Sequence, residues 1–244
     1  MREEANSGEV FLSAEWRDLV FLNYVIDSSL LLPLVPKGTT LGSFQGKTYL
    51  SLVGFRFCNT KLWGKVAVPF HSEFEEVNLR FYVHREAGAE IRRGVVFIKE
   101  IVPKHAVALT ARWIYGENYV SMPMQHKVVR ADDSTNAEYS WQQDDSKFRL
   151  FASSASASVL PSSGSLEQYI TEHYWGYSRQ KSGDTLEYHV THVPWEVCTA
   201  SQTAFSGNSA RLYGEEFGEV LCQPPDSAYI AIGSPVVVYQ GEQF

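Results

Sequence analysis

The chain has 244 residues, of which 44% are hydrophobic and 20% charged, and its formal net charge is −7. This composition allows a sizeable core, and evenly spaced turn signals predict one domain, residues 11–244, after a flexible N-terminus, residues 1–10. The acidic balance argues against a nucleic-acid partner, because no face carries enough Lys and Arg to neutralise a run of phosphates. No apolar run approaches the roughly 20 residues that cross a bilayer, and the polar N-terminus is unlike a signal peptide. We therefore expect a cytoplasmic protein that binds neither nucleic acid nor membrane.

The cysteines and histidines predict neither disulfides nor metal. Cys58, Cys198 and Cys222 lie far apart without a CxxC pair, which is typical of a reducing compartment, and we expect them to be buried as small hydrophobic residues. His189 and His192 are three apart in a predicted strand, so they face opposite sides and are unsuited to a shared metal. No phosphate-binding loop, nucleophile elbow or metalloprotease helix occurs, and we expect no cofactor.

The first predicted strand, residues 16–25, carries a charge in an unusual position. Its alternation puts Arg17 on the same face as Leu19 and Phe21. A charged group on an apolar face must be paired or must line a polar cavity. Arg17 is therefore a candidate ligand-binding residue.

Three further segments follow in chain order. Asp27 is predicted to cap a short helix, residues 28–34, which two prolines keep from growing. Residues 48–57 form the next predicted strand. Apolar and polar side chains alternate over residues 77–84, the pattern of a half-buried strand, and the apolar run at residues 94–102 is typical of a central strand.

A helix is predicted over residues 103–116, because apolar side chains recur there at helical spacing and glycine suits the position after a helix end. This helix would bring Tyr115, Glu117 and Asn118 to one place. Arg112 lies near the helix end, where a positive charge is favourable in any case.

The remainder continues in short strands. Ser165 and Gln168 form a capping box for a helix that continues to about Tyr174. Strands are predicted at residues 127–131, 137–142, 148–152, 186–193, 195–203, 229–232 and 236–239. The aromatic content of 14% also favours a mainly β (α+β) fold. We predict a closed antiparallel β-barrel with a few peripheral helices, because closure removes exposed strand edges.

Two adjacent carboxylates open the predicted hairpin. Glu75 and Glu76 would face opposite sides of a strand, so at most one turns inward. Either both are solvated or paired with Arg80 and Arg112, or one of them sits in a cavity with a raised pKa.

Several longer motifs resemble one family. These are FEEVNLRFYV, RRGVVFIKEIVP, ENYVSMPMQH, ITEHYWGYSR and PWEV. They resemble the YqjF-like family of bacterial proteins of unknown function, over residues 11–239. That family is similar to the acetoacetate decarboxylase-like superfamily, which implies a closed, cone-shaped antiparallel barrel with helices packed outside.

The resemblance also identifies a departure. The decarboxylase has Tyr-Pro-Lys-Lys after its helix, where one lysine forms a Schiff base and the other lowers its pKa, whereas this chain has Tyr115, Gly116, Glu117 and Asn118. Neither Glu117 nor Asn118 can supply the amine nucleophile that a ketimine needs. Lys99, in an otherwise apolar strand, is the remaining alternative.

The resemblance implies further positions. Arg17 occupies a place similar to that of an arginine ahead of a short helix in the decarboxylase. Glu76 is the best match to a glutamate near its cavity, with Glu75 close behind.

Two functions follow as hypotheses. In the first, a cavity in the barrel binds a small oxo or carboxylic compound, and an enzyme of this kind would be a lysine-independent lyase, isomerase or hydrolase rather than an acetoacetate decarboxylase. The catalytic candidates are Glu76 and Glu117, and the substrate-binding candidates are Arg17, Tyr115, Asn118 and Arg112.

In the second hypothesis the barrel is a non-catalytic binding or interaction module. It would use an exposed aromatic patch made of His173, Tyr174, Trp175 and Tyr177, and a homo-oligomer is compatible with this function.

Overall fold

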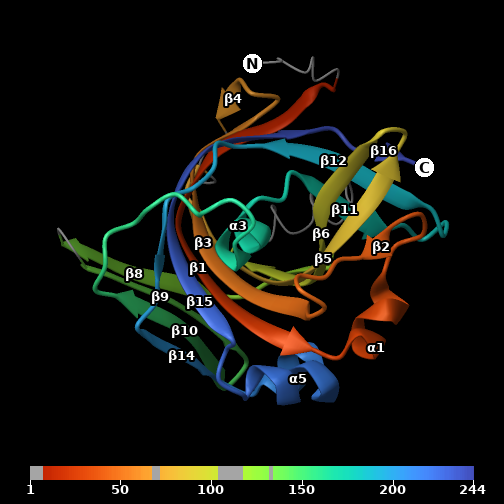
Figure 1. Ribbon diagram of the computed structural model, residues 1–244. Coiled ribbons are helices and arrows are strands. Elements are labelled where there is room, and N and C mark those ends of the chain that lie inside the picture. Colours follow the sequence, from red (N-terminus) through yellow and green to blue (C-terminus); the bar gives the residue numbers. More distant parts are fainter. Residues whose placement is uncertain (1–7, 68–71, 104–117, 132–133) are drawn as a thin grey trace.

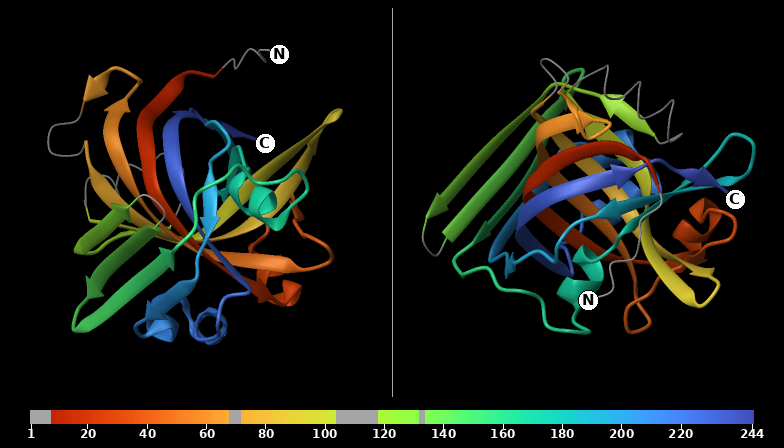
Figure 2. Two further views of the ribbon diagram at one scale, coloured as in Figure 1. Left: turned by 60° about the vertical axis from the view of Figure 1, so that its left-hand side comes forward. Right: turned by 90° about the horizontal axis from the view of Figure 1, so that it is seen from above.

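The computed structural model describes residues 8–67, 72–103, 118–131 and 134–244. Long strands curve around a short helix, and a smaller sheet lies against one side of them (Figures 1 and 2). The predicted helix at residues 103–116 lies outside the described residues except for its first position. No helix among the described residues is long and apolar enough to cross a membrane.

Among the described residues, the long strands of the main sheet follow the order β15-β1-β3-β5-β6-β11-β12. Their bounds are β1 Val10–Ile26, β3 Thr48–Leu62, β5 Phe74–Ala87, β6 Glu90–Val102, β11 Trp175–Arg179, β12 Thr185–Thr191 and β15 Ser227–Tyr239. β12 also pairs with β15, through Val190 opposite Val238 and Thr191 opposite Val237. β15, the first strand in this order, is thus also hydrogen-bonded to β12, the last.

Smaller elements complete the chain. Short strands at the margins of the main sheet are β2 Thr40–Leu41, β4 Val66–Ala67, β7 Tyr119–Ser121, β13 Val197–Thr199 and β16 Glu242–Gln243. The second sheet, in the order β14-β10-β9-β8, consists of β8 Met124–Ala131, β9 Ser134–Gln143, β10 Ser146–Ser154 and β14 Gln202–Ser206. In the described part of the chain the helices are α1 Ser28–Leu31, a 3-10 turn Leu32–Leu34, α3 Leu166–Thr171, α4 Ser209–Tyr213 and α5 Glu215–Leu221.

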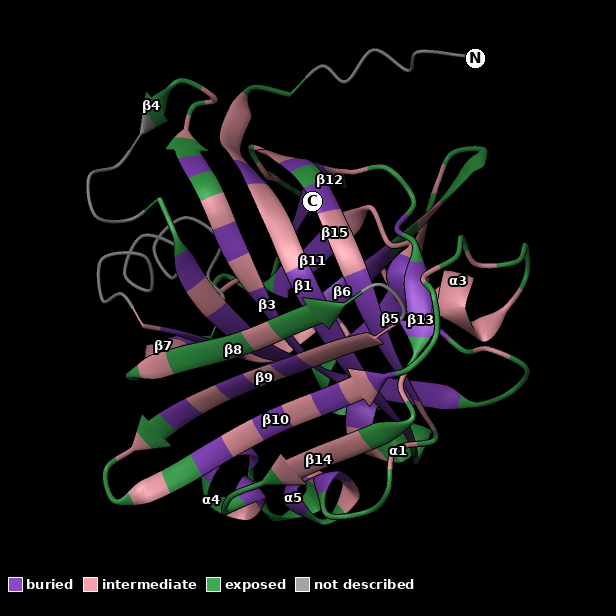
Figure 3. Ribbon diagram, turned by 90° about the vertical axis from the view of Figure 1, so that its left-hand side faces the viewer, coloured by how far each residue is buried: buried purple, intermediate pink, exposed green. Residues whose placement is uncertain are grey.

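The main sheet is buried on both faces. The outer face packs against α4, α5 and the second sheet, which crosses β1, β3 and β15 in Figure 3. In the hydrophobic cluster between them, Leu52 and Leu79 of the main sheet pack with Leu150 of the second sheet. α3 lies at one end of the curved sheet, where its Ile170 packs in one cluster with Phe21 of the inner face (Figure 2). Side chains alternate along each strand, and neighbours in sequence therefore belong to different cores.

Two predicted helix caps are present. The carboxylate of Asp27 accepts a hydrogen bond from the backbone N–H of Ser29, and the hydroxyl of Ser165 accepts one from Gln168. α3 ends at Thr171 rather than near Tyr174. The expectation that the helices are all peripheral is wrong for α3, which lies on the inner side of the curved sheet (Figure 1).

Two strand predictions are wrong in their boundaries. Residues 195–203 divide into β13 in the main sheet and the start of β14 in the second sheet. Residues 229–239 form one strand, β15, through Gly233 and Pro235. Gly233 adopts φ of 86°, a left-handed conformation that lets the strand continue through an irregularity.

A bulge in β1 reverses the predicted position of Arg17. Asp18 has φ of 59°, and the pairing of β1 with β3 shifts between Arg17 and Val20. Trp16, the neighbour of Arg17, packs on the inner cluster with Leu19, so Arg17 faces outward. The prediction that Arg17 shares a face with Leu19 is wrong, because one extra residue in a strand exchanges its faces.

The cysteines differ in exposure. All three are free thiols; Cys198 is buried as predicted, Cys58 is partly buried, and Cys222 is exposed, contrary to the prediction.

Asp18 links the two sheets. Arg56 of β3 and Arg130 of β8 donate to different oxygens of its carboxylate, each through Nε at 3.0 Å, and the hydroxyl of Tyr139 donates to its backbone carbonyl at 2.8 Å. The residue is 4% exposed. A buried carboxylate between two arginines is stabilised by both of them, and removing its negative charge leaves two positive charges without a counter-charge.

We predict that Asp18→Asn lowers the free energy of unfolding by roughly 1–3 kcal/mol, because asparagine tolerates the left-handed backbone but cannot neutralise the two arginines. Urea denaturation measures this change. The matched control is Asp144→Asn, which removes an exposed carboxylate paired with Arg211; its effect should be within about 0.5 kcal/mol. Equal effects of the two substitutions would contradict the assignment.

A second prediction concerns Gly233. A Cβ atom there would lie 1.9 Å from the carbonyl oxygen of Trp16, whereas one at Gly88, which also has positive φ, would meet nothing within 4 Å. Gly88→Ala should cost about 1 kcal/mol for its backbone conformation alone, and Gly233→Ala roughly 3 kcal/mol or more because the clash is added. Urea denaturation of both variants tests this, and a Gly233→Ala protein as stable as Gly88→Ala would contradict it.

Candidate functional site

The inner face of β5 carries a row of polar side chains. Glu76, Asn78, Arg80 and Tyr82 alternate with residues of the outer core, and all four are at most 9% exposed. The alternation predicted from the sequence is present, but its polar side faces the interior of the curved sheet rather than solvent. This burial of two charged residues defines the candidate site.

At one end of this row, Glu76 accepts hydrogen bonds from Asn78 and Tyr119. The side-chain amide of Asn78 donates to Oε1 of Glu76 at 2.9 Å, and the hydroxyl of Tyr119 is 3.3 Å from Oε2. Glu100 of β6 lies directly opposite Asn78 and is 1% exposed. Because directly paired residues share a face, two buried carboxylates flank Asn78 on the inner side.

A hydrogen-bonded chain fixes Tyr82 at the other end. The hydroxyl of Ser51 donates to Oδ1 of Asn23 at 2.7 Å and lies 2.6 Å from the hydroxyl of Tyr82, which must therefore be the donor in that contact. The amide of Asn23 in turn donates to Ser227 at 3.2 Å. The chain crosses β5, β3, β1 and β15, so four strands determine where the Tyr82 ring lies.

His173, just after α3, stacks on Tyr82 with ring centroids 4.6 Å apart. Its Nε2–H donates to the carbonyl of Tyr169 at 2.6 Å, and its Nδ1 is buried without a hydrogen-bond partner in the described part of the chain. Burial, followed by the neighbouring charge of Arg80, lowers the pKa of His173 to about 3. The imidazole is therefore neutral at physiological pH.

The predicted site residues do not all come together. Glu76 faces inward, while Glu75 faces outward and pairs with Nδ1 of His126 at 2.7 Å. Arg17 pairs with Glu15 on the outer face, its Nε 2.8 Å from the carboxylate. Asn118 is exposed, and its side chain donates to the carbonyl of Ile98 at 3.1 Å.

Three predicted site residues, Arg112, Tyr115 and Glu117, lie outside the described residues. Among the residues that sequence reasoning did not assign to the site, Asn78 and Arg80 shared the polar side of the predicted strand, and Glu100 interrupted an apolar run. Polar side chains on a half-buried strand, such as Asn78 and Arg80, indicate a solvent-exposed face, so the sequence pattern alone does not place them inside.

Lys99, the alternative amine, faces outward. In the β5–β6 pairing, Lys99 lies opposite Leu79, which belongs to the outer cluster. Its amine donates a hydrogen bond to the carbonyl of Leu212, and burial lowers its pKa. A contact with the last turn of α4 is a structural role. The geometry does not bring this amine to the inner face.

The predicted aromatic patch is not exposed. Tyr177 is fully buried, and His173, Tyr174 and Trp175 are each partly buried. Trp175 stacks on His189 at 4.4 Å between ring centroids and lies under Arg92. Tyr177 therefore adds nothing to an exposed surface here, and the other three side chains expose only part of their area.

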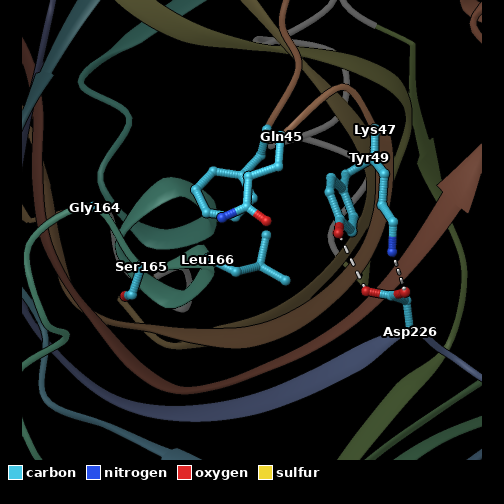
Figure 4. Close-up of a pocket in the computed structure, with 8 residues that line it drawn as sticks. Gln45, Lys47, Tyr49, Gly164, Ser165, Leu166 and Asp226 are labelled. Atoms are coloured by element: carbon cyan, nitrogen blue, oxygen red, sulfur yellow. Dashed lines mark hydrogen bonds and ion pairs between the residues drawn. The ribbon is translucent and has the colours of Figure 1, made fainter.

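A pocket of about 390 Å³ opens beside the N-terminal end of α3 (Figure 4). Its walls include Phe44, Leu166 and Tyr49, whose hydroxyl donates to Asp226 at 3.2 Å; Lys47 pairs with the same carboxylate at 3.4 Å. Burial, and then Asp226, raises the pKa of Tyr49 to about 12.

The described residues contain no group of three or more His, Cys, Asp or Glu side chains placed to hold a metal ion. His189 and His192 instead stack on aromatic rings, His192 at 4.1 Å from the ring of Trp195.

The architecture is similar to solved structures of the acetoacetate decarboxylase-like fold. An enduracididine biosynthesis enzyme, MppR, solved in complex with pyruvate, is 11% identical with a TM-score of 0.69, over 99% of this chain and 93% of that one. The acetoacetate decarboxylase of Legionella pneumophila is 11% identical with a TM-score of 0.63, over 100% and 91%. An acetoacetate decarboxylase-like enzyme from Sphingomonas wittichii is 12% identical with a TM-score of 0.65, over 96% and 93%. At these identities the likeness establishes the fold, which is mainly β and acetoacetate decarboxylase-like.

Within that fold, the family model DUF2071, described as an uncharacterized conserved protein, matches residues 13–238, and the chain belongs to this family. The uncharacterized protein YqjF of Bacillus subtilis (strain 168) is 24% identical over 184 residues, which are 74% of this chain and 72% of that protein. The predicted family resemblance is thereby confirmed.

The pKa of His173 yields a prediction about acid stability. Its folded pKa of about 3 lies below the value of about 6.5 expected in the unfolded chain, so between these pH values only the unfolded chain binds the proton. The free energy of unfolding should therefore fall as the pH drops below about 6.5, by up to roughly 1.4 kcal/mol per pH unit. His173→Gln keeps a donor for the Tyr169 carbonyl and removes the titration. Urea denaturation at several pH values should show a shallower fall for this variant, and equal slopes would contradict the prediction.

Proposed function

We propose that the curved main sheet is a closed β-barrel whose inner face binds a small oxo or carboxylic compound. The pairing of β12 with β15 supports closure, because it joins the two ends of the path of strands. The observation that carries the binding function is the burial of Glu76 and Glu100 beside Asn78 on the inner face. Charged groups are costly to bury, and a site that needs them for a ligand is the usual reason to retain them.

The similar solved structures support this ligand class. One of them is a biosynthetic enzyme in complex with pyruvate and another is an acetoacetate decarboxylase, so proteins of this fold accept small oxo acids. The chain keeps the tyrosine of the decarboxylase pattern at Tyr115 and differs from the pattern at Gly116, Glu117 and Asn118. We therefore propose chemistry without a lysine ketimine, and Lys99 does not replace the missing amine because it contacts α4.

Within the proposed site Glu76 is the acid/base group. Its two oxygens already accept hydrogen bonds from Asn78 and Tyr119, which orient the carboxylate. Catalysis would be that of a lysine-independent lyase, isomerase or hydrolase. Glu117, Tyr115 and Arg112 stay predictions as further site residues, and Asn118 enters the site only if its exposed side chain turns inward.

The alternative, a non-catalytic interaction module, is less well supported, because Tyr177 of the aromatic patch proposed for it is buried and the other three residues are partly buried. The predicted homo-oligomer stays a prediction, which light scattering coupled to size-exclusion chromatography measures.

We predict that pyruvate or acetoacetate raises the Tm of the wild-type protein and exchanges its α-protons with D2O, as acid/base chemistry next to a carbonyl requires. Glu76→Gln should abolish this exchange, measured by proton NMR. The control Glu138→Gln changes a carboxylate of the second sheet that pairs with Arg149, and it should behave like the wild type.

The two halves of this experiment separate binding from catalysis. A Tm shift without proton exchange supports a binding protein that does no acid/base chemistry on these compounds. No Tm shift with any small oxo or carboxylic acid would refute the proposed ligand class.

A further inference from the structure

Arg80 carries a buried positive charge that no described carboxylate neutralises. The residue is 9% exposed, and its Nε is buried without a hydrogen-bond partner in the part of the chain that the structure describes. Its one contact with a described acceptor is long, from Nη2 to the carbonyl of Ile170 at 3.4 Å. Other arginines of the sheets pair with carboxylates, including Arg85, Arg56 and Arg149.

The groups around Arg80 leave its charge in place. Its guanidinium lies 5.4 Å from the ring centroid of Phe21 and 5.7 Å from that of Tyr82, both within the range of cation–π attraction. Aromatic rings orient a guanidinium but carry no negative charge to balance it. His173, which stacks on Tyr82, is neutral at physiological pH because of its low pKa, so it neither repels nor neutralises the arginine.

Other polar atoms beside Tyr82 also lack partners. Nδ1 of His173 and the hydroxyl of Tyr169 are buried without a hydrogen-bond partner among the described residues. Both rings contact Tyr82, with centroids 4.6 and 5.4 Å away. The hydroxyl of Tyr169 can donate and Nδ1 of His173 can accept a hydrogen bond, and both lie with Arg80 around Tyr82. The hydroxyl of Tyr82 itself already contacts Ser51. Buried polar groups in native proteins nearly always have partners, so this grouping indicates a place for a polar ligand.

The pocket beside α3 adjoins this place. Tyr169 packs on Phe44 and Tyr49, which line the pocket, with centroids 5.4 and 6.4 Å apart, and on Tyr82 on its other side. A pocket of about 390 Å³ is large enough for a small organic acid. The Tyr169 ring thus stands between the pocket and the residues around Arg80.

We propose that Arg80 is the anion-binding residue of the site and that the natural ligand carries a carboxylate, an inference that rests on the proposed binding function. The planar guanidinium of Arg80, whose Nε–H has no partner among the described residues, can bind a carboxylate through two parallel hydrogen bonds, and desolvation at this depth strengthens the contact. Arg80 takes the role that the sequence suggested for Arg17, which already pairs with Glu15.

A first test needs no ligand. In a buffer of low ionic strength without carboxylates or phosphate, Arg80→Met should have a Tm equal to or above that of the wild type, because methionine removes an unneutralised buried charge. Arg85→Met on the same strand is the control. Arg85 pairs with Glu187 at 2.9 Å, and its removal should lower the Tm by several degrees. A comparable loss of Tm in Arg80→Met would show that its charge is already satisfied in the free protein and would overturn the inference.

A second test uses pyruvate and its neutral analogue pyruvamide, with binding followed by ligand-observed NMR. The wild type should bind pyruvate at least tenfold more tightly than pyruvamide, and Arg80→Met should lose this preference. Glu76→Gln should retain the preference, even where its overall affinity is lower, because the carboxylate contact is made at Arg80.

The outcomes distinguish the two proposals. Equal binding of pyruvate and pyruvamide by the wild type would overturn the anion-binding role and leave the proposed function standing. Inorganic phosphate binding at Arg80 more tightly than pyruvate would overturn the carboxylate assignment. If neither organic compound binds, the proposed function fails for this ligand class, and the comparison of Arg80→Met with Arg85→Met still decides whether Arg80 lacks a partner.

Discussion

Burial of the main sheet on both faces is the constraint on which the rest of the structure depends. The outer face is covered by the second sheet, α4 and α5, and it takes the aliphatic side chains of β5, such as Val77 and Leu79. The inner face receives the intervening residues, and on β5 these are Glu76, Asn78 and Arg80. Because a strand alternates its side chains, an outward-facing hydrophobic core automatically turns the polar positions inward. The candidate site is thus a direct consequence of where the apolar core lies.

The inner face is divided in its chemistry. Toward Tyr119 it holds carboxylates, Glu76 and Glu100, and toward α3 it holds the cation Arg80 with neutral His173. The low pKa of the histidine removes a second positive charge from this end, and the hydrogen-bonded chain from Tyr82 keeps the aromatic surface in place. A ligand with a carboxylate at one end and a carbonyl or hydroxyl group at the other would complement such a face. α3 closes the arrangement from inside, since Ile170 supplies both core packing and a carbonyl near Arg80.

The family membership and the fold answer different questions. The DUF2071 match identifies relatives without an assigned function, while the likeness to decarboxylase-like enzymes at 9–12% identity establishes architecture alone. The local chemistry therefore has to be argued from this chain's own residues. The proposal of chemistry without a ketimine rests on residues 116–118, which carry no lysine, and on the outward position of Lys99.

The sequence by itself determined the strand content, the caps at Asp27 and Ser165, the alternation of β5 and the family, because these depend on local backbone preferences, spacing and motif. Tertiary structure decided which side of that alternation became interior, since a strand's two faces differ only in what packs on them. It also decided that Arg17 faces outward, because the bulge at Asp18 is stabilised by Arg56 and Arg130 from other strands. No local sequence pattern predicts those contacts. The inward placement of α3, and hence the surroundings of Arg80, likewise rests on residues more than eighty positions apart in the chain.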